Sequence, residues 1–156
     1  MFNPSRQDAR RFFFDIWSRH KAQEPLDGLG KITLAILLAH PEYHPIVDNP
    51  EHYLEQEWHP EGGQTNPFLH MSLHMAVEEQ RSIDQPFGIR SLYAQLALRL
   101  GDEHAAQHEM MECLAEMIWQ AQRQNCAPDV NVYIECVRAR LGMGAEDKPR
   151  PRLDEI

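Results

Sequence analysis

The sequence has no long hydrophobic run and no leader-like N-terminus. Its longest apolar run extends from Ile32 to Ala39 with Thr33 inside it, whereas a membrane-spanning helix needs roughly 20 apolar residues. Asp8 and Asp15 lie close to the N-terminus, and no small-residue cleavage site follows them. This pattern is not that of a signal peptide. We therefore expect a protein that does not span a membrane.

Basic side chains are in the minority. Lysine and arginine number 15 against 24 acidic residues, which gives a net charge of −9 with the histidines neutral. Nucleic acids and anionic membranes both attract positively charged surfaces. We therefore expect no nucleic-acid partner and no membrane partner. The sequence identifies no protein partner, although a helical domain of this size is compatible with a homodimer.

Cysteine is also scarce, and its spacing is uninformative. Cys113, Cys126 and Cys136 are an odd number and form no CxxC pair. Such a pattern is typical of reduced thiols in the cytoplasm rather than of a disulfide framework. The sequence therefore predicts a cytoplasmic protein with free thiols, and it predicts that Cys113 packs against a helix core.

The common catalytic motifs are missing as well. The chain contains no GxSxG nucleophile motif, no phosphate-binding glycine loop and no HExxH zinc motif. These absences exclude the enzyme classes that depend on those motifs. Whether the protein is an enzyme is left open by the sequence.

Helical signals, by contrast, recur along the whole chain of 156 residues. Asn-Pro pairs at 3–4, 49–50 and 66–67 are good helix starts, because asparagine caps a helix and proline suits its first turn. Gly101 and Asp102 predict a helix end followed by a helix start. The periodicity predicts long helices over residues 4–21, 29–39, 67–83, 89–100, 103–124 and 128–141, with a short helix in 50–58.

These elements predict an all-α fold, an irregular helical bundle of five to seven helices. We expect a single helical domain over residues 1–141 and a flexible C-terminal tail over residues 142–156, which has few large apolar side chains.

Histidine is the residue in excess, with nine copies. Four of them form two His-x3-His pairs on predicted helices, His70 with His74 and His104 with His108. Residues four apart on a helix lie on consecutive turns, with Cβ atoms roughly 5–6 Å apart. Two imidazoles so placed can bind one metal ion, and helical bundles present histidine and carboxylate ligands in this way.

Carboxylates accompany both pairs. Glu78 follows His74 by four residues and shares its polar helix face, while Glu112 follows His108 by the same spacing. A helical wheel turns the neighbouring Glu79 toward the core, where a buried carboxylate needs a partner. The wheel of the 103–124 helix places Glu112 at the flank of an apolar face made of Met110, Met111, Cys113, Leu114, Met117, Ile118 and Ala121.

A third pair of the same spacing, His40 and His44, lies in the segment HPEYH. Pro41 and Pro45 interrupt any helix there and predict a connection between helices. We therefore expect His40 and His44 to lie outside the site.

The leading hypothesis is a metal site between the two helices that carry the first two pairs. The predicted site residues, which either bind the metal directly or hydrogen-bond to a ligand and orient it, are His70, His74, Glu79, His104, His108 and Glu112. This donor set suits a divalent transition metal such as zinc, iron, manganese or nickel. A metal-bound water acting hydrolytically is the simplest chemistry for such a site. The alternative is a metal-free interaction or regulatory module in which the histidine and glutamate clusters are structural polar networks.

Three segments, NPFLHMSLHMAVEEQ, SIDQPFGI and HAAQHEMMECLAEMIWQAQR, resemble a bacterial family, the domain of unknown function numbered 1841. The resemblance covers about residues 4–140 and implies a small cytoplasmic bacterial protein, but it implies no activity. The family pattern falls on His70, His74, Glu79, Gln80, Asp84, Gln85, Pro86, Gly88, His104, His108, Glu112, Glu116 and Trp119.

Overall fold

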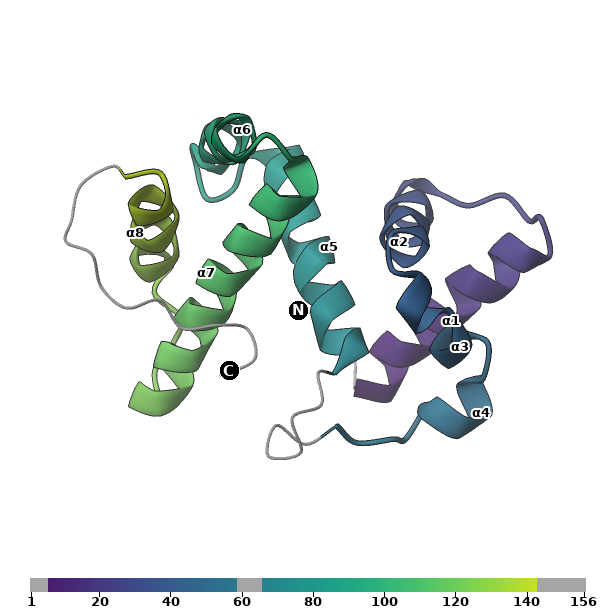
Figure 1. Ribbon diagram of the computed structural model, residues 1–156. Coiled ribbons are helices and arrows are strands. Elements are labelled where there is room, and N and C mark those ends of the chain that lie inside the picture. The colour runs from purple at the N-terminus through teal and green to yellow at the C-terminus, as the bar shows by residue number, and fades with distance from the viewer. Residues whose placement is uncertain (1–5, 59–65, 143–156) are drawn as a thin grey trace. The chain divides into compact units, whose positions relative to one another are not determined.

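The structure, a computed structural model, describes residues 6–58 and 66–142, and within these ranges the protein is all-α (Figure 1). The predicted all-α class is confirmed. The described residues form eight α-helices, one more than the predicted upper number, because the predicted connection after residue 40 contains the four-residue helix at 44–47. The elements are α1 (Arg6–Lys21), α2 (Gly28–Leu38), the 3-10 turn η1 (Pro41–Tyr43), α3 (His44–Val47), α4 (Pro50–Tyr53), α5 (Pro67–Ile83), α6 (Ile89–Leu100), α7 (Glu103–Gln124) and α8 (Val130–Arg140).

The chain forms two compact units, Met1–Met75 and Ala76–Ile156, and the division falls inside α5. The single domain predicted over residues 1–141 stays a prediction. The predicted tail, apart from Gly142, lies outside the described residues.

Local signals in the sequence set the ends of the long helices. The Asn66 side chain accepts hydrogen bonds from the backbone N–H groups of Phe68 and Leu69 at the start of α5. Asp102 does the same for the second and third residues of α7. Gly101 ends α6 with a φ of 71°, a left-handed conformation that favours glycine. The helix starts predicted at 66–67 and 102 are thus confirmed.

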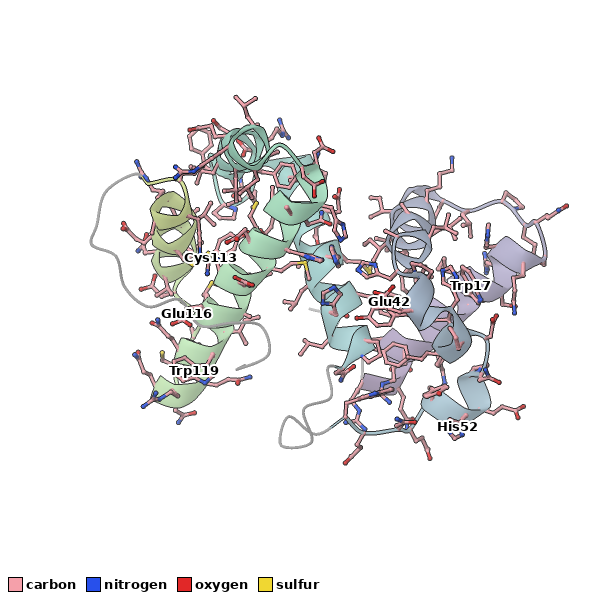
Figure 2. All side chains as sticks on the ribbon, viewed as in Figure 1. Trp17, Glu42, His52, Cys113, Glu116 and Trp119 are labelled. Atoms are coloured by element: carbon pink, nitrogen blue, oxygen red, sulfur yellow. A yellow bond between two sulfur atoms is a disulfide. The ribbon has the colours of Figure 1, made fainter. Side chains whose placement is uncertain are left out.

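Aromatic side chains are prominent in the core of the first unit. Phe13, Phe14 and Trp17 are buried along one face of α1. Phe68, from the first turn of α5, packs against Phe13 and Phe14 with ring centroids 6.1 and 5.5 Å away. Trp17, labelled in Figure 2, donates its indole N–H to the Asp48 carboxylate over 2.7 Å. This packing joins α1 to α5 and to the segment after α3.

In the second unit, α7 packs against both α6 and α8 (Figure 1). The core face predicted for α7 is confirmed at five positions, while Met117 and Ile118 are only half-buried. The buried apolar side chains of α6, α7 and α8 are Ile89, Leu92, Tyr93, Leu96, Ala106, Met110, Met111, Cys113, Leu114, Ala115, Ala121, Tyr133 and Val137.

The expectation of three free thiols is wrong for two of the cysteines. Cys113 of α7 and Cys136 of α8 form a disulfide, with Cα atoms 5.5 Å apart. The packing of α7 on α8 brings the two residues together, and no spacing in the sequence reveals that contact. The predicted burial of Cys113 is confirmed. Cys126 is a free and exposed thiol.

Among the described helices, none combines the length and the apolar character that crossing a membrane requires.

Candidate metal site

The first His-x3-His pair lies near the start of α5. His70 and His74 occupy consecutive turns, and their ring centroids are 4.9 Å apart. The Nε2 atoms of the two rings lie 3.2 Å apart, within hydrogen-bonding distance. His74 is 1% exposed and His70 is half-buried. The sequence-predicted pairing of these two imidazoles is therefore present in the structure.

His40 joins this pair, contrary to the expectation that it lies outside the site. Its ring centroid lies 4.8 Å from that of His74 and 5.1 Å from that of His70. A ring nitrogen of His40 lies within 4.8 Å of one of His74. His40 is only 3% exposed. The first unit therefore brings three imidazoles from two segments of the chain together, and we call them the three-histidine cluster.

The end of α2 sets the orientation of the His40 ring. Pro41 prevents the helix from continuing, and the His40 backbone N–H turns back to the Leu37 carbonyl over 3.1 Å. The His40 Nδ1 lies 2.7 Å from the Ile36 carbonyl oxygen. A carbonyl oxygen only accepts, so Nδ1 carries the hydrogen, and in the neutral ring the lone pair is on Nε2. Histidines that bind metals are commonly held by such a bond.

Tyr43 of η1 lies against the same cluster. Its ring stacks on His40 with a centroid distance of 5.3 Å and an interplanar angle of 5°, and it lies 6.0 Å from the His70 ring. Burial raises the pKa of the Tyr43 phenol, and the neighbouring Glu42 acts in the same direction. Tyr43 therefore stays protonated and offers a neutral aromatic wall.

His44 has the same spacing from His40 but a different environment. Its Nε2 lies 2.8 Å from the Leu37 carbonyl oxygen and therefore carries the hydrogen. Its ring packs on Trp17 with a centroid distance of 4.5 Å. His40 and His44 thus both contact carbonyl groups in the last turn of α2. The Nε2 atom of His44 is engaged in this hydrogen bond, which indicates a structural role for His44.

The distance between the His70 and His74 nitrogens fits a shared metal ion. Zinc–imidazole bonds are about 2.0–2.1 Å long, so two nitrogens on one tetrahedral ion lie roughly 3.3 Å apart. The observed separation is 3.2 Å. Without metal, a hydrogen bond between these atoms needs one proton on one of the two nitrogens. An ion bound to both atoms would replace that proton.

The second His-x3-His pair lies on α7, in the second unit. His104 and His108 have ring centroids 4.2 Å apart, and a nitrogen of one ring lies within 4.8 Å of a nitrogen of the other. His104 is exposed and His108 is half-buried. As a pair on consecutive turns, the two imidazoles have the spacing of a chelating site.

Glu79 does not point to the core, and its predicted orientation is wrong. It is exposed, whereas Val77 is completely buried and Gln80 accepts a 2.7 Å hydrogen bond from buried Tyr133. The inward face of this part of α5 therefore passes through Val77 and Gln80 rather than Glu79.

The other two carboxylates have protein partners. Glu78 is half-buried and accepts hydrogen bonds from Gln107 over 2.6 Å and from Arg81 over 3.1 Å. Glu112 accepts a 2.7 Å hydrogen bond from Arg140. These contacts are those of structural ion pairs. Metal binding by Glu112, like that by Glu79, stays a prediction.

Comparison with known proteins identifies the family. The model of the family described as "Domain of unknown function (DUF1841)" matches residues 5–139, so the chain belongs to that family. Neither the curated proteins nor the solved structures give a match to the chain. The family description assigns no activity, and the function has to be argued from the residues.

Proposed function

We propose that this member of the DUF1841 family binds a divalent transition metal through His40, His70 and His74. The observation that carries the proposal is the packing of three imidazoles whose centroids are 4.8–5.1 Å apart, two of them almost completely buried. The three rings are close enough together to bind one metal ion.

The donor set indicates the class of metal. Imidazole nitrogens suit zinc, copper, iron and nickel, whereas magnesium and calcium prefer oxygen ligands. Of the predicted metals, zinc, iron and nickel therefore fit three nitrogens best, and manganese fits less well. Three protein ligands leave a further coordination position for water, as in catalytic zinc sites. Hydrolysis by a metal-bound water is the chemistry that we propose for this arrangement.

His104 and His108 extend the proposal. Their spacing on α7 suits chelation of an ion, and the sequence hypothesis includes both as ligands. We retain them as proposed ligands, together with Glu79 and Glu112. The number of ions that each histidine pair binds is part of the test below.

Calorimetric titration of chelator-treated, untagged protein with zinc, nickel and iron(II) tests the proposal. We expect tight binding of about one ion or more per chain, and a large loss of affinity in the variant His70→Ala/His74→Ala. The matched control is His20→Ala/His52→Ala, which removes two histidines outside the cluster and should bind metal normally. Equal binding by both double variants would contradict the proposal. A His104→Ala/His108→Ala variant reports whether the α7 pair binds an ion of its own.

A specific observation also favours the alternative of a metal-free interaction module. Phe87 and Leu98, both in the second unit, are 89% and 85% exposed. Contiguous exposed apolar patches mark protein–protein contacts, and these two side chains would contribute to such a patch. The absence of any metal binding in the titration would support this alternative.

A further inference from the structure

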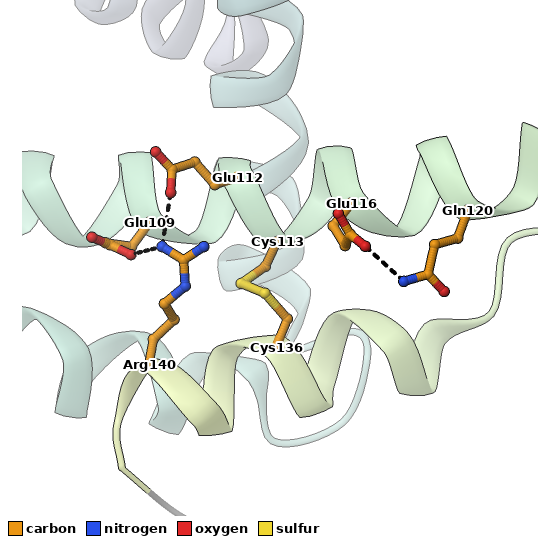
Figure 3. The surroundings of a disulfide bond; sticks show 7 residues. All are labelled: Glu109, Glu112, Cys113, Glu116, Gln120, Cys136 and Arg140. Atoms are coloured by element: carbon orange, nitrogen blue, oxygen red, sulfur yellow. Dashed lines mark hydrogen bonds and ion pairs between the residues drawn. A yellow bond between two sulfur atoms is a disulfide. The ribbon is translucent and has the colours of Figure 1, made fainter. Parts of the chain in front are cut away.

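The Cys113–Cys136 disulfide joins two helices that otherwise share few polar contacts. Cys113 lies in the middle of α7 and Cys136 in the second turn of α8 (Figure 3). Cys113 is 0% exposed, whereas Cys136 is half-buried. Cys136 is therefore the more exposed of the two cysteines.

Next to the disulfide, an ionic contact joins the same helices. Arg140, one helical turn after Cys136, donates to Glu109 and Glu112 of α7 (Figure 3). The Arg140 side chain is 6% exposed. The disulfide and this ion pair are thus adjacent attachments of α8 to α7, one covalent and one electrostatic.

Apolar packing against α7 and a small number of polar contacts also hold α8 in place. Tyr133 donates a 2.7 Å hydrogen bond to Gln80, and Val137 is completely buried. With 11 residues, α8 is below the roughly 12–15 residues that a marginally stable isolated helix needs. The helical state of α8 therefore depends on its attachment to the rest of the second unit.

We propose that Cys113–Cys136 is a redox-active disulfide that exchanges with a dithiol, and that its reduction loosens α8 from α7. A thiolate of the dithiol attacks Cys136 Sγ, the S–S bond breaks, and Cys113 leaves with the electron pair and takes up a proton. The second thiolate then attacks the dithiol sulfur of the mixed disulfide and releases Cys136, which is also protonated. The dithiol becomes a cyclic disulfide, and two electrons pass to the protein.

The composition of the chain favours a reversible bond over a permanent one. Permanent disulfide frameworks belong to small secreted domains rich in paired cysteines. Here a single bond coexists with a free and exposed thiol, Cys126. A single disulfide beside a free thiol is therefore compatible with an exchangeable bond.

Amide hydrogen exchange of residues 130–140 tests the proposal in the full-length protein. Metal-free protein is compared in oxidised form and after reduction with dithiothreitol, so that metal loss to the dithiol cannot contribute. Alkylation and mass measurement should count one free thiol before reduction and three after it. We expect exchange in α8 to become about 30-fold faster or more, as the loss of a typical disulfide predicts. Reoxidation should restore the slow exchange.

Two variants complete the test. Cys126→Ser removes the free thiol and should respond to dithiothreitol like the parent protein. Cys113→Ala/Cys136→Ala should show fast α8 exchange without reductant and no response to it. Unchanged α8 exchange in parent protein with three counted thiols would overturn the proposal. So would a disulfide that dithiothreitol reduces only after denaturant unfolds the protein. The parent protein alone decides the outcome if the double variant does not fold.

Discussion

His40 donates its Nδ1 hydrogen to the Ile36 carbonyl oxygen over 2.7 Å, and this single bond selects the tautomer of the ring. Nε2 is then the nitrogen that carries the lone pair, and the ring lies against His70 and His74. The end of α2 thereby orients a ligand for the cluster. The His40 side chain thus both closes the end of α2 and belongs to the candidate metal site.

Replacing His40 should therefore weaken metal binding. We expect His40→Ala to lower metal affinity by more than about 100-fold, beyond the 10–100-fold typical of changes in groups that only orient a ligand. Titration with zinc followed by calorimetry measures the affinity.

His44→Ala is the control, because it removes a histidine from the same end of α2. It should keep metal affinity but cost about 1 kcal/mol of stability, since it deletes the hydrogen bond to the Leu37 carbonyl and the contact with Trp17. Equal metal affinities of the His40 and His44 variants would refute this assignment.

Asp48 should make the stability of the first unit depend on pH in the acidic range. Hydrogen bonds from Lys21 and Trp17 lower the pKa of its carboxyl group. Because the folded-state pKa lies below the unfolded value, ionised Asp48 stabilises the fold above the unfolded pKa of about 3.9. That contribution disappears as the pH falls through the folded-state pKa.

We expect Asp48→Asn to be less stable than the parent at pH 7, with a difference that shrinks below about pH 4. Urea unfolding at a series of pH values measures this difference. A difference that stays constant from pH 7 to the acid limit would show that the charge of Asp48 contributes nothing.

Arg140 should contribute to the stability of the second unit. Its side chain is 6% exposed, while those of its partners Glu109 and Glu112 are 31% and 24% exposed. Arg140→Met would leave two carboxylates close together without a cation. Breaking a fully buried pair costs about 3–5 kcal/mol, and because water partly reaches these carboxylates we expect about 2–3 kcal/mol.

Denaturant unfolding of oxidised protein measures that loss. The triple variant Glu109→Gln/Glu112→Gln/Arg140→Met should regain part of the stability, because it removes the unpaired charges as well. A loss below about 0.5 kcal/mol in Arg140→Met, the range of ordinary surface changes, would count against a structural role for the ion pair.

Local signals explain why most of the fold could be predicted from the sequence. The bounds of α5, α6 and α7 agree with the prediction. Asn66 precedes the start of α5, Gly101 follows the end of α6, and Asp102 precedes the start of α7, so each signal is adjacent to the helix end that it sets. The short helix predicted in 50–58 corresponds to α4, whereas α3 lies in the segment predicted to be a connection, since four residues carry no helical period.

The candidate site could be predicted only in part, because its third member comes from elsewhere in the chain. The spacing of His70 and His74 on one helix indicated their contact. His40 showed the same spacing to His44, but Pro41 favoured a connection outside the site. Only the packing of α2 near the start of α5 brings His40 to the pair. The disulfide was missed for the same reason, as Cys113 and Cys136 meet through helix packing.

The most direct test of the central claim is the metal content of untagged protein purified without chelator, measured by elemental analysis. We predict about one zinc, iron or nickel atom or more per chain, lost in His40→Ala/His70→Ala/His74→Ala and kept in His44→Ala. Protein that is free of transition metal, and that takes up none when zinc, iron(II) or nickel is added, would contradict the account.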